Sequence, residues 1–388
     1  MNHDVVIVGG GVMGSSAAYH LRRFDPAISV LVLERDASYR YASTVLSEGN
    51  VRIQFNLEEN IRISQHTMEV MATFSEDMAT TAFRPESAPR REGNLFLVDE
   101  AGREVALQGL ELQRSLGCDV EWLEPASIAE VFPSLRTEGL AGGTLGRSDG
   151  GVDPTAVLRG YRNKAIEMGV EYAETEALAL VDSGGPAPRV RTGDGDLAAG
   201  AVLVTAGAWT ADLLLPIGVD LPVVPVRRTV YVVASTVPTA GMPAVFLPSG
   251  AYAIPVSECI WNMAWSLPDD PVGYDFTPAS RGRFEDRVWP ELVAHLPAFD
   301  RLRVETSWAG LYAVNTLDGN AIIGRWPGMS GLYMATGFSG HGFQQAPAVG
   351  RHLAESILGL PHALDLSRLG PQRVIDGIPV REHSGRLI

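Results

Sequence analysis

The chain has 388 residues, 46% of them hydrophobic, so it is long enough to bury one large core or two coupled cores. Its formal net charge of −15 argues against nucleic-acid binding, because phosphate contacts require a basic face. No apolar stretch is long enough to span a bilayer, the first residues lack the order of a secretory signal, and two cysteines cannot form a disulfide framework. We therefore expect a cytoplasmic protein with no membrane partner and no metal site.

A nucleotide-binding pattern occupies the first part of the chain. The apolar run 5–8 predicts a buried parallel strand, residues 15–23 predict a helix, and the run 30–33 predicts a second buried strand. A G-x-G-x-x-G turn joins the first strand to the helix, and its members are Gly9, Gly11, Val12, Met13 and Gly14. Strand, glycine turn, helix and second strand occur in the order that dinucleotide binding requires.

Each position of this pattern has a physical task. Gly9 permits a tight turn, Gly11 lets the backbone approach a pyrophosphate, and Gly14 lets the helix pack on the strand. The helix N-terminus offers N–H groups and a positive dipole end to phosphates. Glu34 lies 20 residues after Gly14, where a carboxylate can bind the ribose hydroxyls, and it would repel the 2′-phosphate that Arg35 could hold. The pattern predicts NAD or FAD rather than NADP.

Three later segments favour FAD. A polar stretch, 43–52, follows the second strand; an apolar run, 202–205, ends in small residues; and a strand at 332–335 feeds a glycine-rich loop, 337–344, before a helix from about 346 to 358. A dinucleotide held at both ends of a chain is typical of FAD. The candidate cofactor-binding residues are Gly9, Gly11, Val12, Met13, Gly14, Glu34, Arg35, Ser43, Thr44, Asn50, Arg52, Ala206, Gly207, Trp209, Gly340, His341, Gly342, Phe343 and Gln344.

The segments 43–55, 206–209, 308–312, 316–324 and 337–343 resemble the D-amino-acid oxidase superfamily, on the branch of glycine oxidase, monomeric sarcosine oxidase and the sarcosine and dimethylglycine dehydrogenases. The resemblance implies an α/β fold in which a Rossmann-type FAD-binding domain is interleaved with a mixed antiparallel-sheet substrate domain. It places the FAD-binding domain at 1–80, 150–220 and 325–370, the substrate domain at 81–149 and 221–324, and a C-terminal tail at 371–388.

The chain itself agrees with this organisation. Asp153 predicts the start of a helix that runs to Met168 and stops at Gly169. Between Val223 and Ala264, short β-rich runs alternate with Pro and Gly, which predicts a sheet that forms one wall of the substrate cavity.

The resemblance also implies a reaction, in which hydride moves from the carbon beside an amine nitrogen to flavin N5. Arg52 falls on the arginine beside the flavin ring, where a fixed cation favours the anionic reduced form. The backbone around His341 is expected to aim N–H groups at the flavin O2 edge. The candidate catalytic residues are Arg52, Tyr312, His341, Gln344 and Asn262, and the candidate substrate-lining residues are Phe55, Tyr252, Trp261 and Tyr312.

The chain departs from its relatives in the grip on a substrate carboxylate. The sarcosine oxidase-like relatives use an arginine where this chain has Phe55, and a lysine where it has Gln344. The loss of both charges removes the clamp that a buried carboxylate needs. We expect a larger or less acidic amine, or one held by another arginine such as Arg227 or Arg228.

Two further departures concern the flavin. Oxidase relatives place a lysine above the ring where this chain has Asn262, and Lys164, the chain's one lysine, lies in the helix predicted after Asp153. A fixed ammonium stabilises superoxide, so its loss favours a dehydrogenase that passes electrons to another acceptor, and an oxidase that uses O2 stays the alternative. Gly310 replaces the cysteine that attaches flavin in relatives, and no histidine lies in 41–50, so FAD is expected to be non-covalent.

Two other functions stay open at this point. The superfamily contains 2-hydroxy-acid dehydrogenases, which need a general base for which the sequence offers no strong candidate. Residues 52–55 and 315–318 resemble the sub-branch that contains a mitochondrial complex I assembly flavoprotein, so a low-turnover assembly factor is the third hypothesis.

Overall fold

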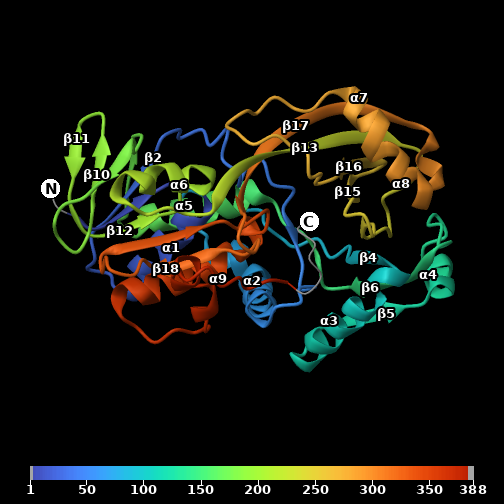
Figure 1. The fold of residues 1–388 in the computed structure, drawn as a ribbon, viewed down its shortest axis with the longest axis horizontal. Helices are drawn as coiled ribbons and strands as arrows, with labels where there is room; N and C mark the ends of the chain where they lie inside the picture. Colours follow the sequence, from blue (N-terminus) through green and yellow to red (C-terminus); the bar gives the residue numbers. More distant parts are fainter. Residues whose placement is uncertain (1–2, 383–388) are drawn as a thin grey trace.

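A mainly parallel sheet and a larger mixed sheet organise residues 3–382, which are the residues that the computed structural model describes (Figure 1). Over that range the first sheet has six strands, in the order β18 (Ile322–Arg325), β19 (Leu332–Thr336), β12 (Ala199–Val204), β1 (His3–Val8), β2 (Val30–Glu34) and β8 (Glu171–Glu174). All neighbours run parallel except β18, which is antiparallel to β19. Both faces of β1 are buried, which explains its continuous apolar sequence.

Four helices pack together beside this sheet. They are α1 (Val12–Phe24), α2 (Glu58–Asp77), α5 (Pro154–Glu167) and α9 (Gly342–Leu358). Helix α1 contacts both α5 and α9, and α9 also contacts α2. The approach of α9 to α1 is close: a Cβ on Gly350 would lie 2.3 Å from the Ser16 hydroxyl. Asp153 caps α5 as predicted, whereas α9 begins at Gly342 rather than near residue 346.

The second sheet is mixed. Within the described part of the chain it has eight strands, in the order β17 (Leu302–Asn315), β13 (Val223–Ser235), β16 (Ile260–Ala264), β15 (Tyr252–Ser257), β14 (Ala244–Phe246), β4 (Asn94–Asp99), β6 (Leu140–Gly146) and β5 (Val120–Leu123). All neighbours are antiparallel except β14 and β4, which run parallel. The predicted fold class is therefore confirmed.

One detail of that prediction is wrong. The first of the expected short runs after Val223 is a 13-residue strand, β13, paired along its whole length with the 14-residue strand β17. The backbone of Pro225 faces residues 271–273, since its carbonyl accepts from the Gly273 N–H, so this proline takes no N–H from the pairing with β17 and the strand continues past it. In Figure 1 the two strands arch side by side above β16 and β15, toward α8.

Shorter elements complete the fold: β3 (Asn50–Val51) with β7 (Gly150–Gly151), the sheet of β9 (Ala179–Val181), β10 (Arg189–Thr192) and β11 (Gly195–Leu197), and helices α3 (Arg103–Ser115), α4 (Pro125–Val131), α6 (Thr210–Leu214), α7 (Arg281–Arg283), α8 (Trp289–His295) and α10 (Gln372–Ile375). A core cluster joins side chains of β13, β15 and β16 to Phe284 and Leu292, so α8 and the turn before it cover this part of the larger sheet.

The predicted domain boundaries stay a prediction, and residues 1–2 and 383–388 of the outer segments lie outside the described residues.

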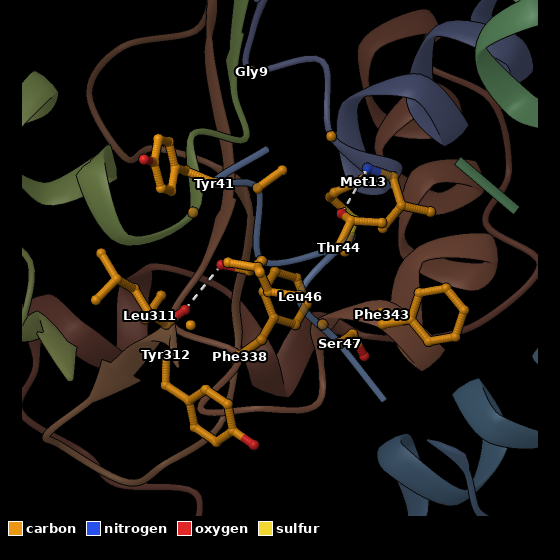
Figure 2. A pocket seen from close by; sticks show the side chains of 18 of the residues that line it. Gly9, Met13, Tyr41, Thr44, Leu46, Ser47, Leu311, Tyr312, Phe338 and Phe343 are labelled. Carbon is orange, nitrogen blue, oxygen red and sulfur yellow. Dashed lines mark hydrogen bonds between the residues drawn. The ribbon is translucent and has the colours of Figure 1, made fainter. Parts of the chain in front are cut away.

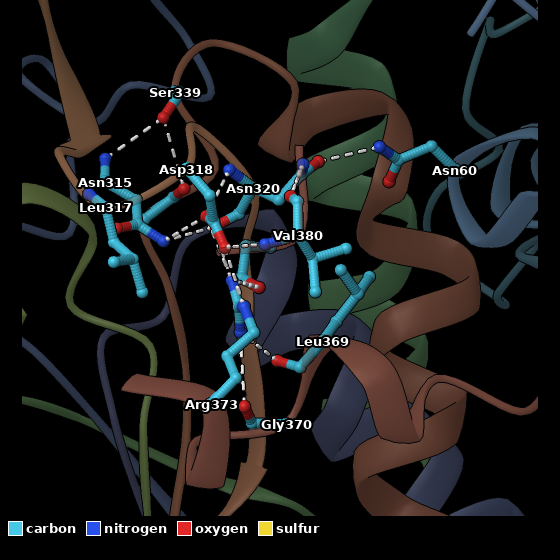
Figure 3. Close-up of polar contacts among 12 residues, drawn as sticks. Asn60, Asn315, Leu317, Asp318, Asn320, Ser339, Leu369, Gly370, Arg373 and Val380 are labelled. Atoms are coloured by element: carbon cyan, nitrogen blue, oxygen red, sulfur yellow. Dashed lines mark hydrogen bonds and ion pairs between the residues drawn. The ribbon is translucent and has the colours of Figure 1, made fainter. Parts of the chain in front are cut away.

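Asp318 connects the end of β17 to the C-terminal segment (Figure 3). Its carboxylate forms a buried ion pair with Arg373, at 2.9 Å between Nε and Oδ2, and accepts the Val380 N–H at 3.0 Å. Asn320 donates to the Val380 carbonyl and accepts from Asn60 of α2. Residues 372–380 are therefore held against the loop after β17, and through Asn320 next to α2, by hydrogen bonds that the sequence pattern did not predict.

Candidate active site

The glycine turn is held in the geometry that a dinucleotide needs. Gly9 has φ +100°, and the hydroxyl of Thr205, the residue after β12, donates to its carbonyl at 2.8 Å. A Cβ on Gly14 would lie 2.0 Å from the Gly9 carbonyl oxygen, so a glycine is required there for α1 to pack on β1. A Cβ on Gly11 would meet no atom closer than the Thr44 hydroxyl at 3.4 Å, because Gly11 borders a cavity. The cradle is therefore open at the position where backbone must approach phosphate.

Glu34 closes one end of this cradle. Its carboxylate accepts the Gly10 N–H at 2.9 Å and the Asp36 N–H at 3.1 Å, while burial raises its pKa. The guanidinium of the neighbouring Arg35 lies over the Trp209 ring, 3.8 Å from its centroid, in a cation–π contact. Glu34 also lines the cavity that begins at the glycine turn, so its predicted contact with a ribose stays a prediction.

The segment between β2 and β3 crosses in front of the α1 N-terminus. Figure 2 shows its two anchoring hydrogen bonds, from the Val12 N–H to the Thr44 hydroxyl at 3.2 Å and from the Ser43 hydroxyl to the Leu311 carbonyl at 2.9 Å. The second bond attaches this segment to β17 of the larger sheet. It therefore connects the nucleotide cradle to the second half of the cavity.

Arg52 lies where the α9 N-terminus meets this segment. Its backbone N–H donates to the Gln344 side chain at 2.8 Å, and its Nη2 lies 2.9 Å from His341 Nε2. The guanidinium also lies over the Phe55 ring, 4.7 Å from the centroid. Burial lowers the Arg52 pKa to about 10, which still leaves a cation at neutral pH. The structure thus places a fixed positive charge at the inner end of the nucleotide cradle.

A single cavity of about 460 Å³ connects these parts to the larger sheet. Most of the predicted site residues line it: Gly9, Gly11, Val12, Met13, Glu34, Arg35, Ser43, Thr44, Asn50, Arg52, Ala206, Gly207, Trp209, Tyr252, Tyr312, Gly340, His341, Gly342, Phe343 and Gln344. Figure 2 labels five of them, namely Gly9, Met13, Thr44, Tyr312 and Phe343. Segments separated by more than 300 residues therefore contribute to one site.

Four predicted site residues lie outside the cavity lining. Gly14 packs on the strand, which is the task the motif assigns to it. Phe55 lies behind His341, with the two rings edge to face at 5.2 Å, and packs into a small buried cluster. The Asn262 amide lies beside the Glu48 carboxyl and lowers its pKa. The prediction for Trp261 is corrected: alternate residues of a strand face opposite ways, and this ring packs on Phe299 in the core.

Sequence reasoning did not single out several cavity residues, among them Glu48, Phe246 and Trp308, whereas Arg228, which it named as an arginine that could hold the substrate, does line the cavity. Glu48 accepts a hydrogen bond from the Tyr252 hydroxyl, and burial raises its pKa to about 7. Arg228 is ion-paired with Asp270 and lies over the Tyr312 ring at 5.6 Å. The partner of Glu48 is 204 residues away, so no local pattern identified this carboxyl.

A family model for the FAD-dependent oxidoreductases of the DAO family matches residues 4–356. The chain belongs to this family. FAD-dependent oxidoreductase domain-containing protein 1 of Bos taurus is 34% identical over 98% of this chain and 86% of that protein. Glycine oxidase of Bacillus licheniformis is 25% identical over 92% of this chain and 94% of that protein. The structure of L-proline dehydrogenase from P. horikoshii matches with a TM-score of 0.87 and 25% identity, over 98% of this chain and 99% of that chain.

The predicted resemblance and the predicted cofactor are therefore confirmed at the level of the family. The residues of this FAD-dependent oxidoreductase fit the cofactor, since the open position at Gly11, the start of α1, which has no capping side chain of its own at Gly11, and the Glu34 carboxylate lie along one cavity. In residues 3–382 no group of three or more His, Cys, Asp or Glu side chains is arranged to hold a metal ion. None of the helices described there has the length and apolarity to cross a membrane.

Proposed function

We propose that this FAD-dependent oxidoreductase oxidises the carbon–nitrogen bond of a primary or secondary amine with an amino-acid-like shape. FAD, when bound, supplies the hydride acceptor at N5. The protein must desolvate the amine, hold its C–H bond toward the flavin and provide a fixed charge. The observation that carries the proposal is one cavity in which Arg52 and the nucleotide cradle are continuous with the side chains of Tyr252, Trp308 and Tyr312.

These aromatic groups suit the binding of an amine. Tyr252 is 6% exposed, and the Trp308 indole is fixed by a hydrogen bond to the Leu46 carbonyl at 3.0 Å. Rigid walls of this kind exclude water and restrict a bound ligand to few orientations, which is how positioning accelerates a transfer reaction. Glycine oxidase and L-proline dehydrogenase, by name, act on compounds that contain an amine, which supports the same class here.

The charges near the cavity favour a substrate without a strongly held carboxylate. Arg227 is paired with Asp275, and Arg228 with Asp270. Asp270 also binds Arg283 at 2.7 Å, so a substrate carboxylate would compete with a carboxylate already fixed between two arginines. This supports the expectation of a larger or less acidic amine.

The position of the lysine supports a dehydrogenase over an oxidase. The Lys164 ammonium donates to the Ala79 carbonyl and pairs with Glu167, both at 2.9 Å, on residues that do not line the cavity. Asn262 occupies the position where oxidase relatives are expected to carry their lysine. An acceptor other than O2, a non-covalent FAD and a cytoplasmic location all belong to this proposal.

Anaerobic addition of amines to the FAD-loaded protein tests the proposal. Bleaching of the flavin by primary or secondary amines supports it, bleaching by 2-hydroxy acids alone supports the second enzymatic hypothesis, and bleaching by neither supports a low-turnover assembly factor. The reduced protein is then exposed to air or to an artificial acceptor. We expect faster reoxidation by the acceptor, and an Asn262→Lys variant that reoxidises in air about tenfold faster or more.

A further inference from the structure

The Glu48 carboxyl is a buried group of the cavity that the roles above do not use. It lies on the segment between β2 and β3 and faces β15 and β16 of the larger sheet. The Tyr252 hydroxyl of β15 donates to Oε2, and the Asn262 amide of β16 also favours the ionised carboxylate. Oε1 is buried and makes no hydrogen bond of ordinary geometry with any residue in 3–382. A buried acceptor without a donor is uncommon in native proteins and calls for an explanation.

The carboxyl also has no cation beside it. Within residues 3–382, no basic side chain forms an ion pair with Glu48, and the pKa rise to about 7 comes from burial, opposed only by Tyr252 and Asn262. The other charged or titratable groups around it are Tyr312 of β17 and Arg228 of β13. Arg228 is already paired with Asp270. A carboxylate in this position is stabilised when a cation with N–H groups enters the cavity.

A protonated amine supplies both things that Glu48 lacks, a positive charge nearby and an N–H donor for Oε1. The last torsion of a glutamate side chain is soft and roughly two-fold, so a small rotation brings either oxygen toward the cavity. We propose that Glu48 binds the protonated nitrogen of the substrate amine and accepts its proton, while Tyr252 and Asn262 hold the carboxyl in position. This inference rests on the proposed amine oxidation and names the group that selects the amine.

The proton transfer balances without a further reactant. An N–H bond of the ammonium breaks, an O–H bond forms on Glu48, and the nitrogen keeps its electron pair. Removal from water disfavours the charged form of each partner, so in the closed cavity the neutral pair is favoured more than it is in water. The neutral nitrogen is the form whose adjacent C–H can leave as hydride. Glu48 therefore acts before the transfer to FAD.

Binding of a matched pair of probes tests this role without turnover. Benzylamine, protonated at about pH 8, and benzyl alcohol share a ring that suits the aromatic cavity and differ in charge. We expect calorimetry on the FAD-loaded protein to give about tenfold tighter binding of the amine, and about threefold or less in Glu48→Gln. The control Glu355→Gln removes a buried carboxylate of α9 that lies outside the cavity lining, and it should keep the full preference.

The pH dependence gives a second readout. Because the Glu48 pKa is raised to about 7, the preference for benzylamine should grow as the pH rises through that value. The Tyr252 hydrogen bond lowers the Glu48 pKa, so Tyr252→Phe should move the midpoint to higher pH while leaving the carboxyl in place. This variant keeps the idea testable if Glu48→Gln does not fold. A preference that does not depend on pH in the wild type would overturn the inference.

The results also separate this inference from the proposed function. If amines bleach the flavin but Glu48→Gln keeps the full preference for benzylamine, Glu48 is not the amine-binding group. If no amine bleaches the flavin but the preference disappears in Glu48→Gln, the amine site stands and the proposed reaction is wrong.

Discussion

The Arg52 guanidinium lies 2.9 Å from His341, Nη2 to Nε2, which joins the segment after β2 to the start of α9. The same arginine is tied to α9 a second time, through the Gln344 side chain. Both partners come from the loop and helix that complete the cavity from the C-terminal side. The cation is thus fixed by residues almost 300 positions away in the sequence.

We predict that Arg52→Gln lowers the two-electron midpoint potential of the bound flavin. A buried cation near the ring stabilises negative charge on the reduced flavin, and a loss of about 1.4 to 3 kcal/mol corresponds to about 30 to 60 mV. Spectroscopic titration against a reference dye measures the shift. Arg303→Gln is the control, because that arginine is exposed and paired with Glu305. An unchanged potential in Arg52→Gln would place Arg52 away from the ring.

Gly11 and Gly14 should respond differently to alanine. In Gly14→Ala the new methyl group meets the Gly9 carbonyl at 2.0 Å, so we expect a lower melting temperature of the apoprotein as well as loss of FAD. In Gly11→Ala the methyl group points toward the cavity. The free energy of unfolding of the apoprotein should therefore stay within about 0.5 kcal/mol of the wild-type value, while the affinity for FAD falls. Equal FAD retention in Gly11→Ala and wild type would contradict the cradle described above.

Asp318→Asn should destabilise the protein strongly. Asp318 is inaccessible to solvent and Arg373 nearly so, and removing one partner of a buried pair costs about 3 to 5 kcal/mol. Denaturant unfolding measures this loss. Limited proteolysis should cleave after α10 earlier than in wild type, because asparagine keeps one oxygen for the hydrogen bonds of Arg373, Asn320 and Val380 that two oxygens accept in Asp318. Removing the exposed Arg303 should change the stability by about 1 kcal/mol or less. Similar losses in free energy of unfolding for the Asp318 and Arg303 variants would contradict the strong stabilisation that we expect from the buried pair of Asp318 and Arg373.

His352 should make the fold sensitive to acid. Burial, followed by the nearby His362, lowers its pKa from 6.5 to about 4. The folded state therefore resists a protonation that the unfolded chain accepts. The stability that neutral His352 contributes is fully present above about pH 6.5 and is lost as the pH falls toward 4. The shift corresponds to about 3 kcal/mol.

The buried carboxyls Glu48 and Asp149 have raised pKa values and act in the opposite direction, so the informative quantity is a difference. Unfolding free energies of wild type and His352→Gln, measured between about pH 4 and pH 7, should converge as the pH falls. Parallel curves would mean that His352 titrates normally in the folded protein.

The part of the site that motif spacing alone predicted is local in the chain. The Gly9 turn, its flanking strands and Glu34 lie within one βαβ unit, so spacing alone specifies their arrangement. Glu48 was missed because its environment is made by strands about 200 residues away. Trp261 and Asn262 are neighbours on β16, and only the pairing of that strand decides which of them faces Glu48. Register between distant strands is a property of the folded protein that one sequence does not display.

The packing of α1 against α9 has a consequence for biosynthesis. The cradle needs Gly9 to Gly14, but the opposite wall of the cavity forms only after residues 340–344 have been translated and α9 has packed against Ser16. A nascent chain on the ribosome lacks that wall for most of its synthesis, so its first βαβ unit is expected to hold FAD weakly. Cofactor capture then becomes one of the last steps of folding, and chains interrupted before α9 should emerge colourless.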